Sequence, residues 1–302
     1  MGIEIAGFKA IGVVGGGQMG AGIAQVFATH GLQTVLVDVS DNQLQKAKSG
    51  IEASLEKLAG KNVIDSASRE RALKALTFKN DMQALAGCDL IVEAITENER
   101  VKVEVFQKID KITPATTIFA SNTSSIPITR LAAATSRPGQ FIGMHFMNPV
   151  PLMKLVEIIP GMTTSEETTR RILDLAHALG KETSRSADYP GFVVNRILMP
   201  MINEAIYSLY EGVAGVEEID TVMKLGMAHP MGPLQLADFI GLDVCHSILK
   251  VLHDGFGNPK YGPCPLLTNM VTAGKLGAKS GEGFYIYTPG SKELMVSSNF
   301  KK

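Results

Sequence analysis

The sequence lacks three features that mark large classes of protein: an excess of charge of one sign, a cysteine framework and a long apolar run. Lys and Arg total 29 against 30 Asp and Glu, a formal net charge of −1, so no positive field gathers phosphate backbones or anionic lipids. The three cysteines, Cys88, Cys245 and Cys264, are widely spaced, which argues against disulfides and a zinc site. No apolar run approaches the ~18–20 residues that cross a bilayer.

We therefore expect buried thiols, no bound metal, and neither nucleic acid nor a membrane as partner. The N-terminus leads within a few residues into a predicted strand rather than a signal peptide, so we expect a soluble, cytoplasmic protein. What the chain does have is length and apolar content. Its 302 residues, 45% of them hydrophobic, are enough for two packed domains of ~100–200 residues each.

The first 38 residues have the pattern of a βαβ unit. An apolar run over 8–14 predicts a strand, which is followed by Gly15-Gly-Gly-Gln-Met-Gly20 and then by apolar residues at helical spacing. Gly31 fits the end of that helix, and 32–38 is a second apolar strand that ends in an acid.

Strand and helix patterns continue to alternate as far as residue 188. We expect strands over 90–93, 117–121, 141–146 and 154–159, and helices near 41–59, 67–76, 98–112, 126–134 and 164–180. This alternation predicts an α/β fold with a doubly wound, mostly parallel sheet of the Rossmann type. Helical patterns dominate after 188–191, among them one helix over 232–254. We therefore expect a nucleotide-binding domain over 1–188 and an all-α domain over 189–302.

Gly15, Gly17 and Gly20 have the spacing and the context of a dinucleotide-binding turn, because they follow a strand, open a helix and precede an acid. The first glycine permits the tight turn, the second lets the backbone approach a pyrophosphate, and the third lets the helix pack closely on the sheet. The helix N-terminus would attract the phosphates. The alternative is a glycine-rich turn that binds nothing.

Asp38 stands 18 residues after Gly20, where a carboxylate can accept hydrogen bonds from the ribose hydroxyls of an adenosine. A 2′-phosphate at that place would meet like charge, at a cost of ~1–4 kcal/mol at about 4 Å. The sequence therefore predicts NAD rather than NADP. The alternative is a loop acid that caps the next helix, although Ser40 or Asp41 fits that cap better.

A histidine and a glutamate lie on two consecutive predicted strands, 141–146 and 154–159, with prolines between them. If the strands pair antiparallel about position 151, partners sum to 302, and 145 + 157 gives that sum, so His145 and Glu157 face each other. A carboxylate on one imidazole nitrogen fixes the tautomer and makes the other nitrogen a base, which suits the oxidation of an alcohol by hydride transfer. The alternative is a core histidine beside a structural acid.

Seven ordered motifs resemble one family over essentially the whole chain. They are the glycine turn, Ala120-Ser-Asn-Thr-Ser-Ser125, Gly143-Met-His-Phe-Met-Asn-Pro-Val-Pro151, Met153-Lys-Leu-Val-Glu157, Pro190-Gly-Phe-Val-Val-Asn-Arg196, His229-Pro-Met-Gly-Pro233 and Gly281-Glu-Gly-Phe284. The sequence is similar to the L-3-hydroxyacyl-CoA dehydrogenases, in particular to the stand-alone bacterial 3-hydroxybutyryl-CoA dehydrogenases. The resemblance implies reversible, NAD-dependent oxidation of an (S)-3-hydroxyacyl-CoA, with acetoacetyl-CoA or 3-hydroxybutanoyl-CoA as substrate.

The resemblance also implies roles for individual residues. His145 would be the general base and Glu157 its orienting partner, Ser124 and Asn195 would hold the 3-oxygen and thioester region, and Asn148 would line the acyl-CoA site. The cofactor would contact Gly15, Gly17, Gln18, Met19, Gly20, Asp38, Glu97, Lys102, Asn122 and Lys279. Coenzyme A would contact Ser54 and Lys61, in a segment that is locally rich in lysine. The plainer alternatives are a solvated lysine face and a Ser124 that only caps a helix.

Two other functions fit the same pattern. Relatives with this fold oxidise free hydroxy acids such as L-gulonate or carnitine, and a structural NAD-binding protein could keep the fold without activity. The intact set His145, Glu157, Ser124 and Asn195 argues against the latter. The predicted helix over 192–213 is apolar over much of its circumference, so we also expect a homodimer formed through the C-terminal domain.

Overall fold

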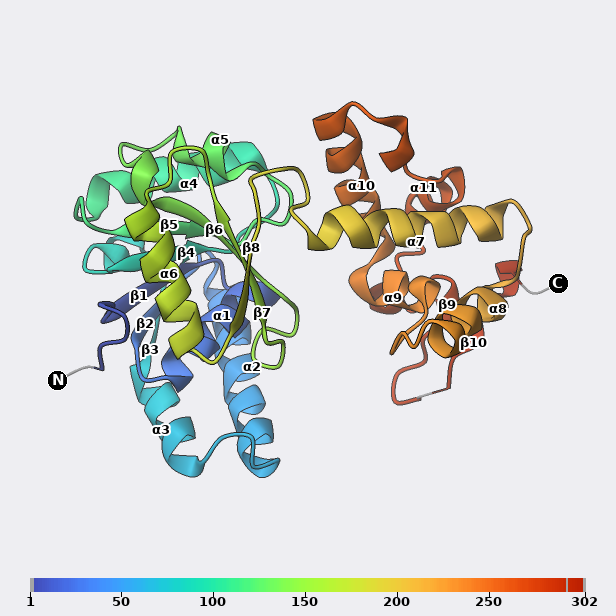
Figure 1. Cartoon of the computed structure of the whole chain (residues 1–302). Coiled ribbons are helices and arrows are strands. Elements are labelled where there is room, and N and C mark those ends of the chain that lie inside the picture. Colours follow the sequence, from blue (N-terminus) through green and yellow to red (C-terminus); the bar gives the residue numbers. More distant parts are fainter. Residues whose placement is uncertain (1–2, 292, 301–302) are drawn as a thin grey trace. The chain divides into compact units, whose positions relative to one another are not determined.

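The computed structural model describes residues 3–291 and 293–300. It divides into two compact units, one ending at Tyr189 and the other beginning at Pro190 (Figure 1). The division lies one residue beyond the expected boundary. The Asp188 carboxylate accepts the N–H groups of Ile128 and Thr129, each at 2.7 Å, so the last residues of the first unit are fastened to its own helix.

The first unit is built around an eight-stranded sheet in the order β3-β2-β1-β4-β5-β6-β7-β8. The strands are β1 (Ala10–Val14), β2 (Gln33–Val37), β3 (Leu76–Lys79), β4 (Leu90–Glu93), β5 (Ile118–Ser121), β6 (Phe141–Phe146), β7 (Leu155–Pro160) and β8 (Glu182–Arg185). Every neighbouring pair is parallel except β6 and β7. The predicted mostly parallel, doubly wound sheet is confirmed, and its chain order reverses between β1 and β4.

Helices cover both faces of this sheet, as the side chains of β5 illustrate. They are α1 (Gln18–Thr29), α2 (Asp41–Gly60), α3 (Ser66–Ala75), α4 (Glu99–Ile112), α5 (Ile128–Ala132) and α6 (Glu166–Ala178). Successive strand residues point to opposite faces. Ala120 therefore joins the apolar cluster under α1 and α6, whereas the ring of Phe119 lies 5.8 Å from that of Phe106 on α4.

In the first unit, the elements predicted from local sequence signals are confirmed in the middle of the sheet, whereas its edge strands were missed. Ser40 caps α2, as predicted, by accepting the N–H of Gln43. The helix expected over 164–180 begins at Glu166, because Ser165 caps α6 by accepting the N–H of Thr168. Strands β3 and β8 were not expected, because they are short, only partly buried and lie at the two edges of the sheet.

The second unit is mostly helical, as predicted. It contains α7 (Val194–Tyr210), α8 (Val216–Thr221), α9 (Pro233–Ile240), α10 (Leu242–Phe256), α11 (Pro265–Thr272) and a small antiparallel hairpin of β9 (Tyr285–Ile286) and β10 (Met295–Val296). The single helix expected over 232–254 is two helices, because Gly241 adopts a φ of +100° that a helix cannot contain. The core of the second unit includes Met199, Ile206 and Phe284.

Two further expectations concern the whole chain. All three cysteines are unpaired and buried, as predicted. None of the helices in the described part of the chain combines the length and the apolar composition that a bilayer crossing requires.

Candidate active site

The glycine turn has the backbone that its sequence predicted. Gly15 adopts a φ of +107°, and a Cβ there would lie 2.6 Å from the carbonyl oxygen of Ala94. A Cβ on Gly20 would overlap the carbonyl oxygen of Gly15, whereas one on Gly17 would meet open space. Two glycines therefore serve the turn and the close packing of α1, and the third leaves its side open to a ligand.

A cavity of about 570 Å³ lies beside this turn, at the ends of β1, β2 and β4. Gly15, Gly17, Gln18, Met19, Asp38 and Thr96 are among its lining residues. Asp38 is held in place because its carboxylate accepts the N–H groups of Gly16 (2.7 Å) and Ser40 (2.9 Å). An adenosine ribose needs such a fixed acceptor, and within the described chain no side chain caps the first turn of α1. The residues present therefore fit a dinucleotide.

His145 and Glu157 face each other across the one antiparallel strand pair of the sheet. The predicted register is confirmed, with His145 opposite Glu157. Nδ1 of the imidazole lies 2.8 Å from Oε2 of the carboxylate, and the two residues are 7% and 1% exposed. A carboxylate at this distance fixes the proton on Nδ1, which makes Nε2 the proton acceptor.

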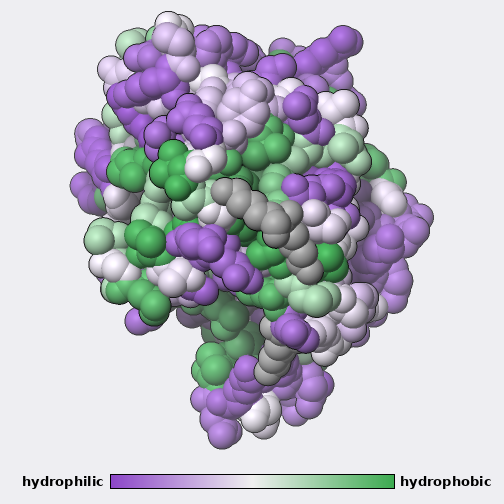
Figure 2. Space-filling view, turned by 90° about the vertical axis from the view of Figure 1, so that its right-hand side faces the viewer, coloured by the Kyte–Doolittle hydropathy of each residue, from purple (hydrophilic) through white to green (hydrophobic). Residues whose placement is uncertain are grey.

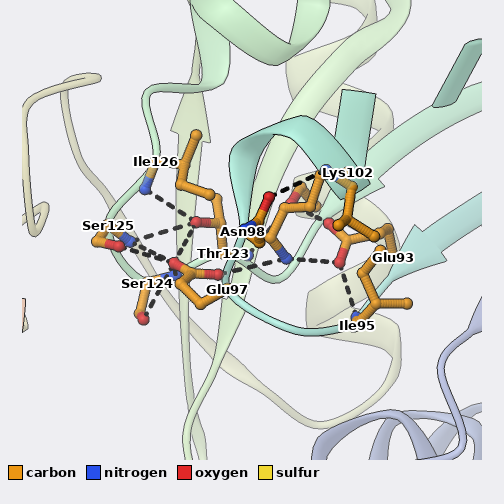
Figure 3. A network of polar contacts seen from close by, with 11 residues as sticks. Glu93, Ile95, Glu97, Asn98, Lys102, Thr123, Ser124, Ser125 and Ile126 are labelled. Atoms are coloured by element: carbon orange, nitrogen blue, oxygen red, sulfur yellow. Dashed lines mark hydrogen bonds and ion pairs between the residues drawn. The ribbon is translucent and has the colours of Figure 1, made fainter. Parts of the chain in front are cut away.

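The loop after β5 gathers around one acid, Glu97 (Figure 3). Oε1 of Glu97 accepts the hydroxyl of Thr123 at 2.6 Å and the N–H groups of Ser124 and Ser125 at 3.0 and 3.1 Å. The Ser124 and Ser125 hydroxyls also contact this oxygen, at 3.4 and 2.8 Å. Ser124 does not cap the next helix, because α5 begins only at Ile128. That alternative interpretation of Ser124 is wrong.

Asn122 connects this loop to the histidine strand. Its side-chain oxygen accepts the N–H of Phe146 at 2.8 Å, and its own N–H donates to the carbonyl of Glu93. The ends of β4, β5 and β6 are therefore linked side by side. The structure brings Asn122, Glu97 and Lys102 together at the carboxyl edge of the sheet, which is where ligands bind in open α/β folds.

A second groove, of about 360 Å³, runs between α1, α2 and the loop after β6. Ser54, predicted to contact coenzyme A, and Asn148, predicted to line the acyl-CoA site, line it together with Lys46 and the glycine turn. Lys61 does not line it, because it lies at the C-terminal cap of α2, seven residues after Ser54.

The two remaining predicted residues belong to the second unit. Asn195 is the second residue of α7 and is 6% exposed. Lys279 lies in a short turn of helix over 278–280, where its ammonium is 2.5 Å from the carboxylate of Asp243.

Comparison with known proteins decides the family. The family model described as "3-hydroxyacyl-CoA dehydrogenase, NAD binding domain" matches residues 10–189, and the one described as "3-hydroxyacyl-CoA dehydrogenase, C-terminal domain" matches 191–287. The chain belongs to the 3-hydroxyacyl-CoA dehydrogenase family. Its eight-stranded unit is therefore the NAD-binding domain of that family, and the cofactor predicted from the glycine turn and Asp38, NAD, is confirmed.

Several similar members of the family come from bacteria. The chain is 57% identical over 276 residues to the probable 3-hydroxybutyryl-CoA dehydrogenase of Deinococcus radiodurans, covering 91% of this chain and 99% of the relative. It is 52% identical over 279 residues to the probable 3-hydroxybutyryl-CoA dehydrogenase of Bacillus subtilis, covering 92% and 97%. The solved (S)-3-hydroxybutyryl-CoA dehydrogenase of Ralstonia eutropha superposes with a TM-score of 0.89 at 48% identity, covering 93% and 99%.

Three residues around the site escaped the sequence analysis. Glu93 and Ser121 end the neighbouring strands β4 and β5, where their side chains meet at 2.6 Å. Lys181 donates to the carbonyls of Val150 and Met153 and so fastens the loop that carries Asn148. A polar residue at the end of an otherwise apolar strand was the available signal for the first two. No sequence signal marked Lys181, because its hydrogen-bond partners lie about 30 residues away along the chain.

Proposed function

We propose that the protein catalyses the reversible oxidation of (S)-3-hydroxyacyl-CoA thioesters to 3-ketoacyl-CoA with NAD, and that 3-hydroxybutanoyl-CoA is its substrate. The observation that carries this proposal is the hydrogen bond of 2.8 Å between the His145 imidazole and the Glu157 carboxylate. This pair lies on strands of an NAD-binding domain whose similar relatives are named 3-hydroxybutyryl-CoA dehydrogenases.

In the proposed mechanism, His145 moves the proton. Its Nε2 accepts the 3-hydroxyl proton as the C3 hydride leaves, and in the reverse direction the imidazolium returns that proton. When bound, NAD supplies the hydride acceptor. Glu157 is buried beside Nδ1, so its charge stabilises the imidazolium that forms. Ser124 holds the substrate oxygen, which presents the 3-hydroxyl proton to Nε2 of His145. Asn195 keeps the substrate-binding role that the resemblance implies.

The groove over α1 and α2 supports a coenzyme A thioester rather than a free acid. Ser54, Asn148 and Lys46 line a space of about 360 Å³ that begins at the glycine turn. A small hydroxy acid such as L-gulonate lacks the long coenzyme A moiety that would occupy this groove. Lys61 follows α2 as its C-terminal cap, and its charge suits the phosphates of the coenzyme A tail.

The test is NADH oxidation with acetoacetyl-CoA, with longer 3-ketoacyl-CoA thioesters, and with free keto acids of the alternative substrates. We expect turnover of acetoacetyl-CoA to exceed that of every free acid. His145→Gln should lower kcat by about 10²–10⁴-fold while NADH still binds, and the matched control His177→Gln should leave kcat unchanged. Normal turnover by His145→Gln would refute the base, and a wild-type protein inactive on all thioesters would refute the function.

We further propose a cytoplasmic homodimer, formed through the helical unit, that acts in fatty-acid and butanoate metabolism. Several apolar side chains of this unit are more than half exposed, among them Ile197 (67%), Val222 (62%) and Leu225 (82%). Figure 2 shows patches of apolar surface separated by hydrophilic side chains. A second copy would cover such patches. Light scattering should give twice the chain mass of 32.3 kDa, and a monomer at micromolar concentration would refute the dimer.

A further inference from the structure

Glu93 is a buried acid that the proposed mechanism does not use. It ends β4, has no exposed surface, and its carboxylate accepts three hydrogen bonds. Oε1 accepts the Lys102 ammonium at 2.5 Å and the Ile95 N–H at 2.7 Å, and Oε2 accepts the Ser121 hydroxyl at 2.6 Å. Lys102 is only 1% exposed. Desolvating such an ion pair is costly, and a buried pair by itself is weak evidence for stability.

The ion pair does not end at Lys102. The same ammonium lies 3.3 Å from Oε2 of Glu97, and Oε1 of Glu97 is the acceptor around which residues 123–125 gather. Figure 3 shows the resulting chain of contacts, which leads from Glu93 through Lys102 and Glu97 to Ser124. Glu93 is thus linked to a site residue although it reaches no ligand itself.

The charge of Glu97 is essential to this arrangement. Burial alone would raise the pKa of Glu97, but the charge of Lys102 and hydrogen bonds from Thr123, Ser125 and Ser124 outweigh burial and lower it. An ionised carboxylate is an acceptor only and can serve several donors at once, whereas a protonated one must donate. Lys102 can supply this charge only where its ammonium is held, and Glu93 holds it.

We propose that Glu93 is a positioning residue for Ser124: it fixes Lys102, Lys102 fixes Glu97, and Glu97 sets the backbone and the hydroxyl of Ser124. The inference rests on the proposed function, in which Ser124 holds the 3-oxygen of the substrate. It assigns to a fully buried side chain an effect on the geometry of the reaction.

The experiment compares Glu93→Gln with the wild type. Glutamine keeps the shape and one acceptor but removes the charge that holds Lys102. We expect kcat with acetoacetyl-CoA to fall by about 10–100-fold, since a small misplacement of a positioning group has effects of that size. Because the amides of Ser124 and Ser125 donate to Glu97, their hydrogen exchange should accelerate by about tenfold or more.

A matched control separates positioning from stability. Asp110 and Arg137 form another ion pair of the same unit, with side chains 12% and 9% exposed and a separation of 2.7 Å. Asp110→Asn should lower the melting temperature as Glu93→Gln does, yet leave kcat and the exchange of Ser124 and Ser125 unchanged. If Glu93→Gln fails to fold, Ser121→Ala takes its place, with both charges kept and an expected fall in kcat of about three- to tenfold.

The outcomes distinguish the two proposals. Wild-type kcat and wild-type exchange at Ser124 and Ser125 in Glu93→Gln, or in Ser121→Ala if that is the folded variant, would overturn the positioning role. An equal effect of Asp110→Asn on both readouts would overturn it as well. The exchange measurement needs no substrate, so it still tests this chain of contacts if the wild-type protein turns over no thioester and the proposed function falls.

Discussion

Each unit buries a cluster of acids, but the two clusters have different partners. In the NAD-binding unit, Glu93 and Glu157 face Lys102 and His145, groups that carry or acquire a positive charge. In the helical unit, the partners of Asp220 and Asp238 among the described residues are neutral backbone N–H groups and tyrosine hydroxyls. The first arrangement pairs each acid with a group of opposite charge, whereas the second fastens segments of chain.

The second cluster joins three segments of the helical unit. Asp220 accepts the N–H groups of Leu234 and Gln235, which caps α9, and the hydroxyl of Tyr285. Asp238 accepts the N–H groups of Phe284 and Tyr285 at 3.0 and 2.9 Å, which holds β9. Burial of an acid therefore does not by itself indicate a functional site, and the nature of its partners is the better guide.

The largest expected effect is on the structural cluster. Asp220→Ala leaves a buried N–H group, a partly buried one and a buried tyrosine hydroxyl without their acceptor, so the free energy of unfolding should fall by about 3–5 kcal/mol. Urea denaturation followed by tyrosine fluorescence measures it. The matched control, Glu217→Ala on the surface of α8, should change this free energy by less than about 0.5 kcal/mol. A loss below about 1 kcal/mol for Asp220→Ala would show that the cluster fastens nothing.

The next effect is a pH dependence. Burial raises the pKa of Asp238 from 3.8 to about 6, against the opposing hydrogen bonds from Tyr285, Phe284 and Tyr287. A raised folded-state pKa gives stability that is present below the unfolded value and is lost as pH rises through about 6. The two-unit shift corresponds to about 3 kcal/mol. The unfolding free energy of the wild type, relative to Asp238→Asn, should therefore fall between about pH 4 and pH 6, and a flat difference contradicts it.

For the first cluster we expect a loss of activity with little loss of stability. Glu157→Gln keeps a hydrogen-bond acceptor for Nδ1 of His145 but removes the charge that stabilises the imidazolium, so kcat should fall by about 10²-fold. Thermal denaturation should give a melting temperature near that of the wild type. A variant that loses stability and keeps its kcat would place Glu157 with the structural acids.

The smallest effect concerns Lys181, a buried cation that donates to the carbonyls of Val150 and Met153. Burial lowers the pKa of this lysine. Lys181→Met should cost about 1–3 kcal/mol of unfolding free energy and raise the KM for acetoacetyl-CoA, because the loop with Asn148 loosens, while kcat changes little. An unchanged KM would mean that the loop holds its shape without this lysine.

The sequence predicted those parts of the site whose partners are close along the chain or set by a regular repeat. The turn from Gly15 to Gly20 is a local motif, and the pairing of His145 with Glu157 follows from the period of two along a hairpin. By contrast, Asp220 accepts a hydrogen bond from Tyr285, which lies 65 residues further along the chain, and no local sequence pattern predicts that contact. Lys102 was identified by resemblance, but Glu93 looked like the polar end of an apolar strand.

The fold shows the same limit. The central strands are continuous apolar runs, which parallel sheets require, so they were recognisable. Strand β8, with the sequence Glu-Thr-Ser-Arg, has no apolar residue, and only its pairing with β7 makes it a strand. The split at Gly241 depends on a backbone angle that the surrounding apolar pattern does not reveal.

His145 and Glu157 lie on adjacent strands of a single hairpin in one unit. The backbone ladder between β6 and β7 therefore sets the separation between imidazole and carboxylate, and all the residues of that ladder lie within 141–160. A one-residue slip in the register would turn one of the two side chains to the opposite face of the sheet and separate the pair.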